Sequence, residues 1–211
     1  MIISINELAL IREKHKNQRI VYCDGVFDLT HAGHVLFFED CKKHGDILVV
    51  MVGNDFNLRL YKGEERPILN EHLRLKMVDS FKPVDYAFLD IDAPHKDFLA
   101  LKSDVIFKTL KPNFYIINTD AYDMPRRYEL VKGFDTKLVI LKRTCFPEFE
   151  EISTTRIINK IKSLSNKEKG AEGGNPTLRP KLTDALLELD VRQVRKDEHR
   201  QTDHLTIKDF S

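Results

Sequence analysis

Apolar positions along the chain alternate between short runs and segments with helical spacing. The runs predict five strands, at residues 19–23, 46–52, 86–90, 114–118 and 137–141. Between them, apolar residues three and four positions apart predict helices at residues 4–16, 31–43, 70–81, 98–110, 126–132 and from Ser153 onward. Strands separated by helices in this rhythm are typical of a parallel sheet that is covered on both faces. We therefore predict an α/β fold, a Rossmann-like doubly wound parallel sheet of five strands with helices on both faces.

Polar residues mark where two of these helices begin. Asn70 fits an N-cap for a helix that runs through Leu73 and Met77, and Ser153 fits an N-cap for the last helix. Their side-chain oxygens can accept the unpaired N–H groups of a first turn. Residues 53–69, just before the first of these helices, are polar and basic, and we predict a loop there.

The alternation of strands and helices ends near Leu164, so we predict one main domain at residues 1–164. Residues 165–181 are charged and rich in Gly and Pro, which predicts a linker. Residues 182–211 are a C-terminal extension, helical or partly disordered, in which residues 182–194 have the spacing of one amphipathic helix. A tail of about 30 residues cannot build its own core, so it docks on the domain or on a partner subunit, or stays disordered.

Charge and composition argue against several classes of protein. The 34 Lys and Arg residues are balanced by 33 Asp and Glu residues, which gives no general electrostatic case for a nucleic-acid or membrane partner. The three cysteines have no paired short spacing, which argues against a zinc cluster or a disulfide framework. The first residues lack the features of a signal peptide, and no apolar run approaches the roughly 20 residues that span a bilayer. We expect a cytoplasmic protein whose anion site, if it has one, is local.

The strongest chemical signal follows the first predicted strand, in the segment GVFDLTHAGH at residues 25–34. His31 and His34 are three residues apart, so they share one face of the first turn of the next helix. Unpaired backbone N–H groups and the positive end of the helix dipole meet at that turn and suit a phosphate group. Gly25 and Gly33 let the backbone approach a ligand closely. Two ordinary histidines beside turn glycines are the simpler interpretation, but the ordered combination favours an anion site.

Polar residues follow the other predicted strands as well. Lys62 lies in the basic segment after the second strand, and Asn118 and Asp120 follow the fourth. Arg143 and Thr144 come after the fifth strand. Taken singly, these residues have simpler explanations, such as a solvated loop, an Asx turn or a surface charge. Because the carboxyl ends of parallel strands meet at one edge of the sheet, we expect one crevice to be surrounded by residues 24–34, 53–67, 118–122 and 143–155.

The segment GVFDLTHAGH resembles the signature of the cytidylyltransferase-like branch of the HxGH nucleotidyltransferases. Within this branch the chain is most similar to the nucleotidyltransferase domain of heptose-phosphate enzymes, and then to glycerol-3-phosphate cytidylyltransferases. The likeness runs from Ser4 to Leu164. It implies transfer of CMP or AMP from CTP or ATP to the phosphate of a small sugar, polyol or alcohol, with release of pyrophosphate. It also implies Mg²⁺ bound through the nucleotide phosphates, and a homodimer.

The resemblance implies roles for individual residues. His31, His34 and Lys62 would be catalytic, and the lysine would reach the α-phosphate. The implied nucleotide-binding residues are Gly25, Val26, Phe27, Asp28, Gly33, Arg74, Asn118, Asp120, Arg143, Thr144, Ile152, Ser153 and Thr154.

The chain departs from the family pattern at two places. Asn118 and Thr119 precede Asp120, where the family usually has glycine before the acidic residue. Residues 145–150 separate Arg143-Thr144 from the segment that begins at Ile152, whereas cytidylyltransferases often join the two directly. This second region helps to select the base. CTP and ATP both stay open, because the heptose enzymes use ATP while Arg143-Thr144 favours CTP.

Two rival interpretations remain. Aminoacyl-tRNA synthetases share the HxGH signature, but they need a longer chain and an RNA-binding surface. A non-catalytic nucleotide-binding or scaffold protein could use the same fold, although the intact set of His31, His34 and Lys62 argues against it. A pyrophosphate-release assay separates an enzyme from a scaffold.

Overall fold

The structure, a computed structural model, describes residues 1–90, 105–121 and 123–171 of the chain. The chain divides into two compact units, Met1–Lys160 and Ile161–Ser211. The first unit contains the sheet and the candidate site, and in the second only residues 161–171 are described. In the described residues, no helix is both long enough and apolar enough to cross a membrane.

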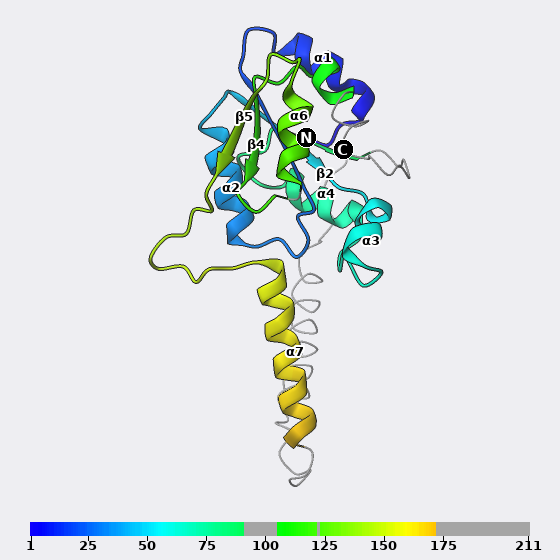
Figure 1. Cartoon of the computed structure of the whole chain (residues 1–211), viewed down its shortest axis with the longest axis vertical. Helices are drawn as coiled ribbons and strands as arrows, with labels where there is room; N and C mark the ends of the chain where they lie inside the picture. The colour runs from blue at the N-terminus through cyan, green and yellow to red at the C-terminus, as the bar shows by residue number, and fades with distance from the viewer. Residues whose placement is uncertain (91–104, 122, 172–211) are drawn as a thin grey trace, which may run out of the picture. The chain divides into compact units, whose positions relative to one another are not determined.

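The first unit is built on a parallel sheet of five strands (Figure 1). The strand order β3-β2-β1-β4-β5 places β1 at the centre of the sheet, which confirms the predicted fold. All strand pairs are parallel, and every residue of β2 is buried, as expected for a strand covered on both faces. The strands are β1 (Ile20–Gly25), β2 (Ile47–Val52), β3 (Tyr86–Leu89), β4 (Phe114–Asn118) and β5 (Lys137–Leu141).

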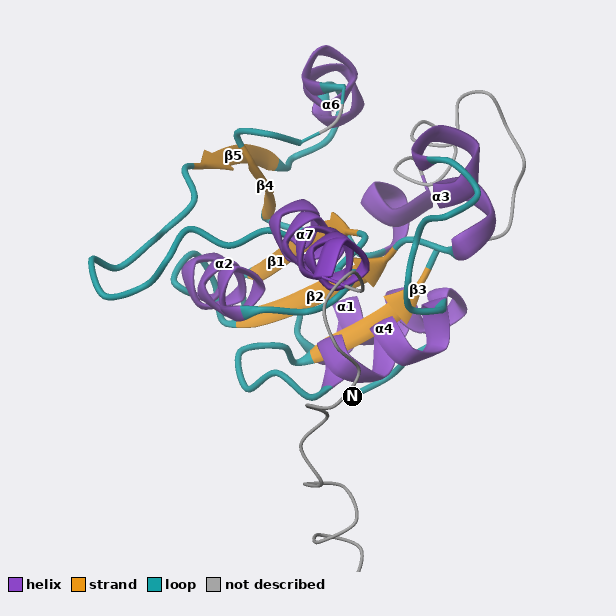
Figure 2. Ribbon diagram, turned by 90° about the horizontal axis from the view of Figure 1, so that it is seen from below, coloured by secondary structure: helices purple, strands orange, loops and turns teal. Residues whose placement is uncertain are grey.

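Helices cover both faces of this sheet (Figure 2). The named helical elements are the 3-10 turn η1 (Ile5–Glu7) and the α-helices α1 (Leu8–Lys14), α2 (Ala32–Lys42), α3 (Asp55–Lys62), α4 (Glu71–Asp79), α6 (Met124–Val131) and α7 (Thr154–Ala171). Of the helix predicted at residues 98–110, residues 105–109 are helical, Leu110 lies in the turn that follows them, and residues 98–104 lie outside the described residues.

Two hydrophobic clusters lie on opposite faces of the sheet because successive side chains of a strand point in opposite directions. Tyr22 packs in one cluster with residues of α1 and of the helical segment 105–109. Val21 and Cys23 pack in the other cluster with residues of α2 and α4. Both faces of the sheet are therefore packed against helices, and the carboxyl ends of the strands remain available for a site.

Helix α3 corrects the sequence analysis, which predicted a loop throughout residues 53–69. The side chain of Asn54 caps the helix by accepting a hydrogen bond from the N–H of Asn57 at 2.8 Å. Leu58 is buried, whereas Phe56 and Leu60 are exposed, so the apolar residues of this short helix do not form one inward stripe. Gly63 ends the helix with a φ of 87°, a conformation that glycine adopts without strain. Lys62 is therefore the last residue of a helix and does not lie in a loop.

Helix α4 begins as predicted, and its buried face carries an arginine. The side chain of Asn70 accepts the N–H of Leu73 at 3.0 Å, which confirms the predicted N-cap. Leu73 and Met77 are exposed, while Arg74 is completely buried on the face that packs inward. An arginine therefore occupies a core position on this helix.

Helix α7 continues to Ala171, so the first part of the predicted linker is helical. This part contains lysine, glutamate and alanine, which favour helices, and its only glycine lies in the last turn. The remainder of the linker and the C-terminal extension at residues 182–211 lie outside the described residues, and their predicted organisation stays a prediction.

Candidate active site

A cavity of about 410 Å³ lies at the carboxyl ends of β1 and β4. It brings together most of the residues that the sequence singled out, from four segments far apart in the chain. These are Gly25, Val26, Phe27, Asp28, His31, Gly33, His34, Lys62, Asn118, Asp120, Arg143, Ser153 and Thr154. The sequence prediction of a single crevice is therefore confirmed for these residues.

His31 and His34 are stacked at the start of α2, with ring centroids 4.0 Å apart and ring planes 24° apart. His31 is the N-cap, and its Nδ1 accepts a hydrogen bond from the N–H of Gly33 at 3.2 Å. In a neutral imidazole this leaves Nε2 as the N–H donor. A Cβ at Gly33 would lie 3.0 Å from Cε1 of His31, so glycine gives the ring room to fold over the helix start. The first turn thus presents ring donors and backbone donors together.

Burial keeps both histidines neutral. Burial, and then the charges of His31 and Arg143, lower the pKa of His34 from 6.5 to about 3. Burial and Arg143 also lower the pKa of His31. The Nδ1 atom of His34 is buried and has no hydrogen-bond partner among the described residues. The pair therefore offers uncharged N–H donors near neutral pH, and a bound anion would shift both pKa values upward.

Lys62 reaches the cavity from the C-terminal end of α3. Burial, and then the neighbouring Arg66, lower the pKa of its ammonium, while Asp28 and Asp120 act in the opposite direction. Its ammonium is partly removed from water, so its interaction with a phosphate oxygen is less screened than at an open surface. Such a cation can respond to charge that develops on a bound phosphate.

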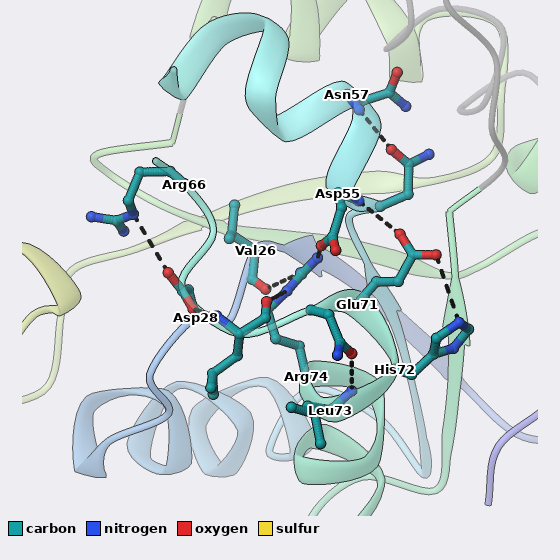
Figure 3. Close-up of polar contacts among 12 residues, drawn as sticks. Val26, Asp28, Asp55, Asn57, Arg66, Glu71, His72, Leu73 and Arg74 are labelled. Atoms are coloured by element: carbon teal, nitrogen blue, oxygen red, sulfur yellow. Dashed lines mark hydrogen bonds and ion pairs between the residues drawn. The ribbon is translucent and has the colours of Figure 1, made fainter. Parts of the chain in front are cut away.

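Asp28 is almost completely buried, and its carboxylate holds the loop that follows α3. The two carboxylate oxygens accept the N–H groups of Ile68 and Leu69 at 2.9 and 3.0 Å. Arg66 lies 3.5 Å from the same carboxylate (Figure 3). The sequence analysis assigned Asp28 to the nucleotide, and the structure shows that its oxygens already bind the protein backbone.

The start of α7 also lines the cavity. Ser153 caps this helix, because its Oγ accepts the N–H of Arg156 at 3.2 Å. The hydroxyl of Thr154 donates to the backbone carbonyl of Asp28 at 2.7 Å and so joins α7 to the loop between β1 and α2. A second helix N-terminus therefore presents backbone donors beside those of α2.

Asp120 and Arg143 form an ion pair that links the ends of β4 and β5. Both side chains are about half exposed, so solvent screens the pair. The backbone carbonyl of Asn118 accepts the N–H of Ala121 at 3.0 Å, which forms a tight turn that carries Asp120. The chain therefore forms a turn here without the glycine that is usual in the family.

A second cavity of about 330 Å³ adjoins the first and shares Gly33, Asp120, Arg143 and Ser153 with it. Two of the three remaining predicted residues, Thr144 and Ile152, line this second cavity. Its wall also includes residues of the segment 145–150 that separates the two halves of the family motif, among them Cys145, Phe149 and Glu150.

Arg74 is completely buried and lines neither cavity, which corrects the nucleotide-binding role that the resemblance implied for it. Its guanidinium is buried behind the site and donates to Val26, Leu69 and Asp55 (Figure 3). An arginine on a polar helix gives no sequence signal that distinguishes a core position from a surface one.

Sequence reasoning missed a buried ion pair in the wall of the main cavity. Arg127 of α6 donates through Nη1 to both oxygens of Asp24, at 2.9 and 3.1 Å. The hydroxyl of Tyr115 donates to the same carboxylate at 2.8 Å. Asp24 directly precedes the GVFDLTHAGH segment and was a detectable candidate, whereas Arg127 gave no local signal. Arg66, Ala121 and Thr155 also line the cavity and lie within the segments expected around it, whereas Phe37 and Ile117 lie outside those segments.

Comparisons with known proteins agree with this geometry. The Bifunctional protein HldE of Helicobacter pylori strain Shi470 is 35% identical over 136 residues, which cover 63% of this chain and 29% of that protein. The Bifunctional protein HldE of Campylobacter jejuni subsp. jejuni serotype O:2 is 33% identical over 162 residues, which cover 76% of this chain and 31% of that protein. The chain thus spans about a third or less of the length of these relatives.

Solved structures show the same fold. A lipopolysaccharide core biosynthesis protein from Thermoplasma volcanium GSS1 matches with a TM-score of 0.50 at 27% identity, over 61% of this chain and 99% of that one. Pantothenate synthetase from Thermus thermophilus matches with a TM-score of 0.54 at 16% identity, over 82% of this chain and 76% of that one. The second likeness concerns the fold alone.

The family model that matches the chain is described as cytidylyltransferase-like and covers residues 22–160. This range contains the end of β1, the histidine pair at the start of α2, Lys62 and the start of α7. On the strength of this match, the chain belongs to the cytidylyltransferase-like family.

Proposed function

We propose that the chain transfers a nucleoside monophosphate from CTP or ATP to the phosphate of a small phosphorylated sugar, polyol or alcohol and releases pyrophosphate. The observation that carries this proposal is the stacked, neutral pair of His31 and His34, which shares one cavity with Lys62 and the starts of α2 and α7. Two helix N-termini and an ammonium around one cavity suit a triphosphate.

No protein nucleophile is needed for this reaction. An oxygen of the acceptor phosphate forms a bond to the α-phosphorus, and the bond from that phosphorus to the oxygen bridging to the β-phosphate breaks. Pyrophosphate leaves with the electron pair of that bond. The protein contributes by holding the two phosphates in line and by stabilising charge on the phosphorus oxygens. His31 and His34 supply N–H donors, and Lys62 supplies a cation.

The family implies a Mg²⁺ ion held through the nucleotide phosphates. No group of three or more His, Cys, Asp or Glu residues that could hold a metal ion occurs in the described part of the chain. The lining carboxylates of Asp28 and Asp120 are engaged with backbone N–H groups and with Arg143. These residues fit a metal bound mainly by phosphate oxygens, with Asp120 as the more accessible protein ligand. Bound Mg²⁺ would neutralise charge on the triphosphate.

The second cavity is the proposed base site. It adjoins the phosphate-binding cavity at Gly33 and combines the apolar side chains of Leu36 and Phe149 with the polar side chains of Arg143 and Thr144. An apolar slot with a few polar groups at its edge suits a nucleobase. Both CTP and ATP remain candidate donors, and we further propose that the protein is cytoplasmic and acts as a homodimer, as the resemblance implies.

The test is a pyrophosphate-release screen of the four nucleoside triphosphates against a panel of sugar, polyol and amino-alcohol phosphates. The proposal expects turnover with at least one nucleotide and one phosphate ester, and none without the ester. His34→Ala in the same screen is the control for contaminating activity. Tight nucleotide binding without turnover on any ester would support the alternative, a non-catalytic nucleotide-binding or scaffold protein.

A further inference from the structure

Arg74 binds three segments around the active site, although it lines neither of the two cavities. Its side chain is 0% exposed. Its Nε donates to the carbonyl of Leu69 at 2.9 Å, its Nη1 to the carbonyl of Val26 at 2.6 Å, and its Nη2 to Oδ1 of Asp55 at 2.6 Å (Figure 3). A guanidinium offers these donors in one rigid, planar fork. The relative positions of the three acceptors are therefore tied to a single side chain.

The first of these segments is the loop between β1 and α2, which carries strain. Phe27 and Leu29 have φ angles of 53° and 45°, in the left-handed region that residues other than glycine rarely adopt. Residues in this conformation are strained and persist only where their surroundings hold them. Arg74 binds the carbonyl of Val26, directly before the first strained residue. The carboxylate of Asp28, between the two strained residues, is held by the amides of the loop before α4.

The second segment is the start of α3. Asp55 is the first residue of this helix, and its carboxylate pairs with Arg74. Its backbone N–H donates to Oε2 of Glu71, the first residue of α4, at 2.7 Å. Two contacts from the first turn of α4 thus fix the start of α3. Lys62 is the last residue of the same short helix, so its place in the cavity depends on how that start is held.

We propose that Arg74 is a positioning residue that keeps the strained loop leading to His31 and the helix carrying Lys62 in one catalytic geometry. The effect of Arg74 on the reaction rate rests on the proposed transfer reaction. A lysine cannot replace it, because a single ammonium on a flexible stem cannot serve three acceptors that lie in different directions. A misplacement of about 1 Å by a change remote from the chemistry can cost about 10²-fold in rate.

The first experiment compares Arg74→Lys and Arg74→Met with the control Val78→Ala. Val78 lies one turn further along α4 and is 0% exposed, so its truncation destabilises the same helix without removing a contact of Arg74. Activities are normalised to the folded fraction of each protein. We expect kcat to fall about 10²-fold in the Arg74 variants, with a smaller change in the KM for nucleotide. Arg74 variants with the kcat of Val78→Ala would show a purely structural role and overturn the proposal.

A double-mutant cycle with Lys62→Ala tests whether Arg74 acts through the lysine. Residues that act as a unit give non-additive losses, whereas independent sites add. We expect Arg74→Lys to cost distinctly less in the Lys62→Ala background than in the wild type. Equal losses in the two backgrounds would overturn the α3 part of the proposal. If both Arg74 variants fail to fold, Asp55→Asn replaces them in the cycle, because it removes the ion pair with Arg74 with little change of shape. An unchanged kcat in Asp55→Asn would overturn the α3 part of the proposal.

Hydrogen exchange supplies a readout that does not depend on activity. The amides of Ile68 and Leu69 donate hydrogen bonds to Asp28. If Arg74 positions this loop, these two amides should exchange their hydrogens faster in Arg74→Lys, or in Asp55→Asn in its place, than in Val78→Ala. Equal exchange in variant and control would overturn the proposal. If no pair of nucleotide and ester shows turnover in the wild type, the proposed reaction fails. The exchange measurement still decides whether Arg74 holds these segments in place.

Discussion

Replacing His34 should reduce the loss of stability that the folded chain suffers when the pH is lowered. Burial, together with His31 and Arg143, lowers the pKa of His34 in the folded chain from 6.5 to about 3. Between these two values the unfolded chain binds a proton at this position and the folded chain does not. Stability therefore falls as the pH is lowered through this window, and His34 contributes nothing to the pH dependence above it.

The size of the effect follows from proton linkage. Within the window the contribution of His34 has a slope of about 1.4 kcal/mol per pH unit. Between about pH 7.5 and about pH 5 it lowers the free energy of unfolding by about 2 kcal/mol. The lowered pKa of His31 acts in the same direction, but it is common to the wild type and to a His34 variant and cancels in the comparison.

Urea unfolding of the wild type and His34→Gln at the two pH values measures this difference. The variant should lose about 2 kcal/mol less than the wild type on acidification, whatever its stability near neutral pH. Parallel pH profiles would refute the burial of a neutral His34 and, with it, its role as an uncharged donor.

Three further predictions concern the other parts of the site. Lys62→Ala should lower kcat more than it raises the KM for nucleotide in steady-state assays, because the lysine meets charge that develops in the transition state; a change in KM alone would make it a binding residue. Thr154→Val should cost about 1 kcal/mol in urea unfolding through loss of its hydrogen bond to Asp28, and an unchanged midpoint would show that the bond contributes nothing. Truncation after Leu164 should leave nucleotide affinity in calorimetry largely intact, since the cavity residues all precede that point, and lost affinity would place part of the site in the tail.

The sheet was predictable because its strands carry a strong and simple pattern. β4 and β5 have the predicted bounds, and the other three strands differ only at their ends. Asn70 and Ser153 were predictable as caps because a side-chain oxygen before a helix has one main use. The histidine pair was predictable because the spacing of three residues places both rings on one helical turn.

The errors occur where tertiary contacts override local pattern. Helix α3 was missed because a polar segment gains its stability from the Asn54 cap and from contacts with α4, neither of which appears as apolar periodicity. The structural role of Arg74 was not predicted because its partners, two carbonyls and a carboxylate, lie in three other segments. Arg127 was missed in the same way, since its partner Asp24 is remote in sequence. Sequence spacing identifies neighbours within an element but not a buried charge that joins several.

The fate of the α-phosphorus tests the central claim most directly. The chain is incubated with a nucleoside triphosphate labelled at the α-phosphorus and with the best phosphate ester from the screen, and the labelled products are separated. The account predicts that the label appears in the ester adduct in equal amount to released pyrophosphate, and that His34→Ala lowers this yield about 10²–10³-fold while remaining folded. Label found only in free nucleoside monophosphate, transfer of the γ-phosphate instead, or a His34→Ala protein with more than about a tenth of the wild-type rate would contradict it.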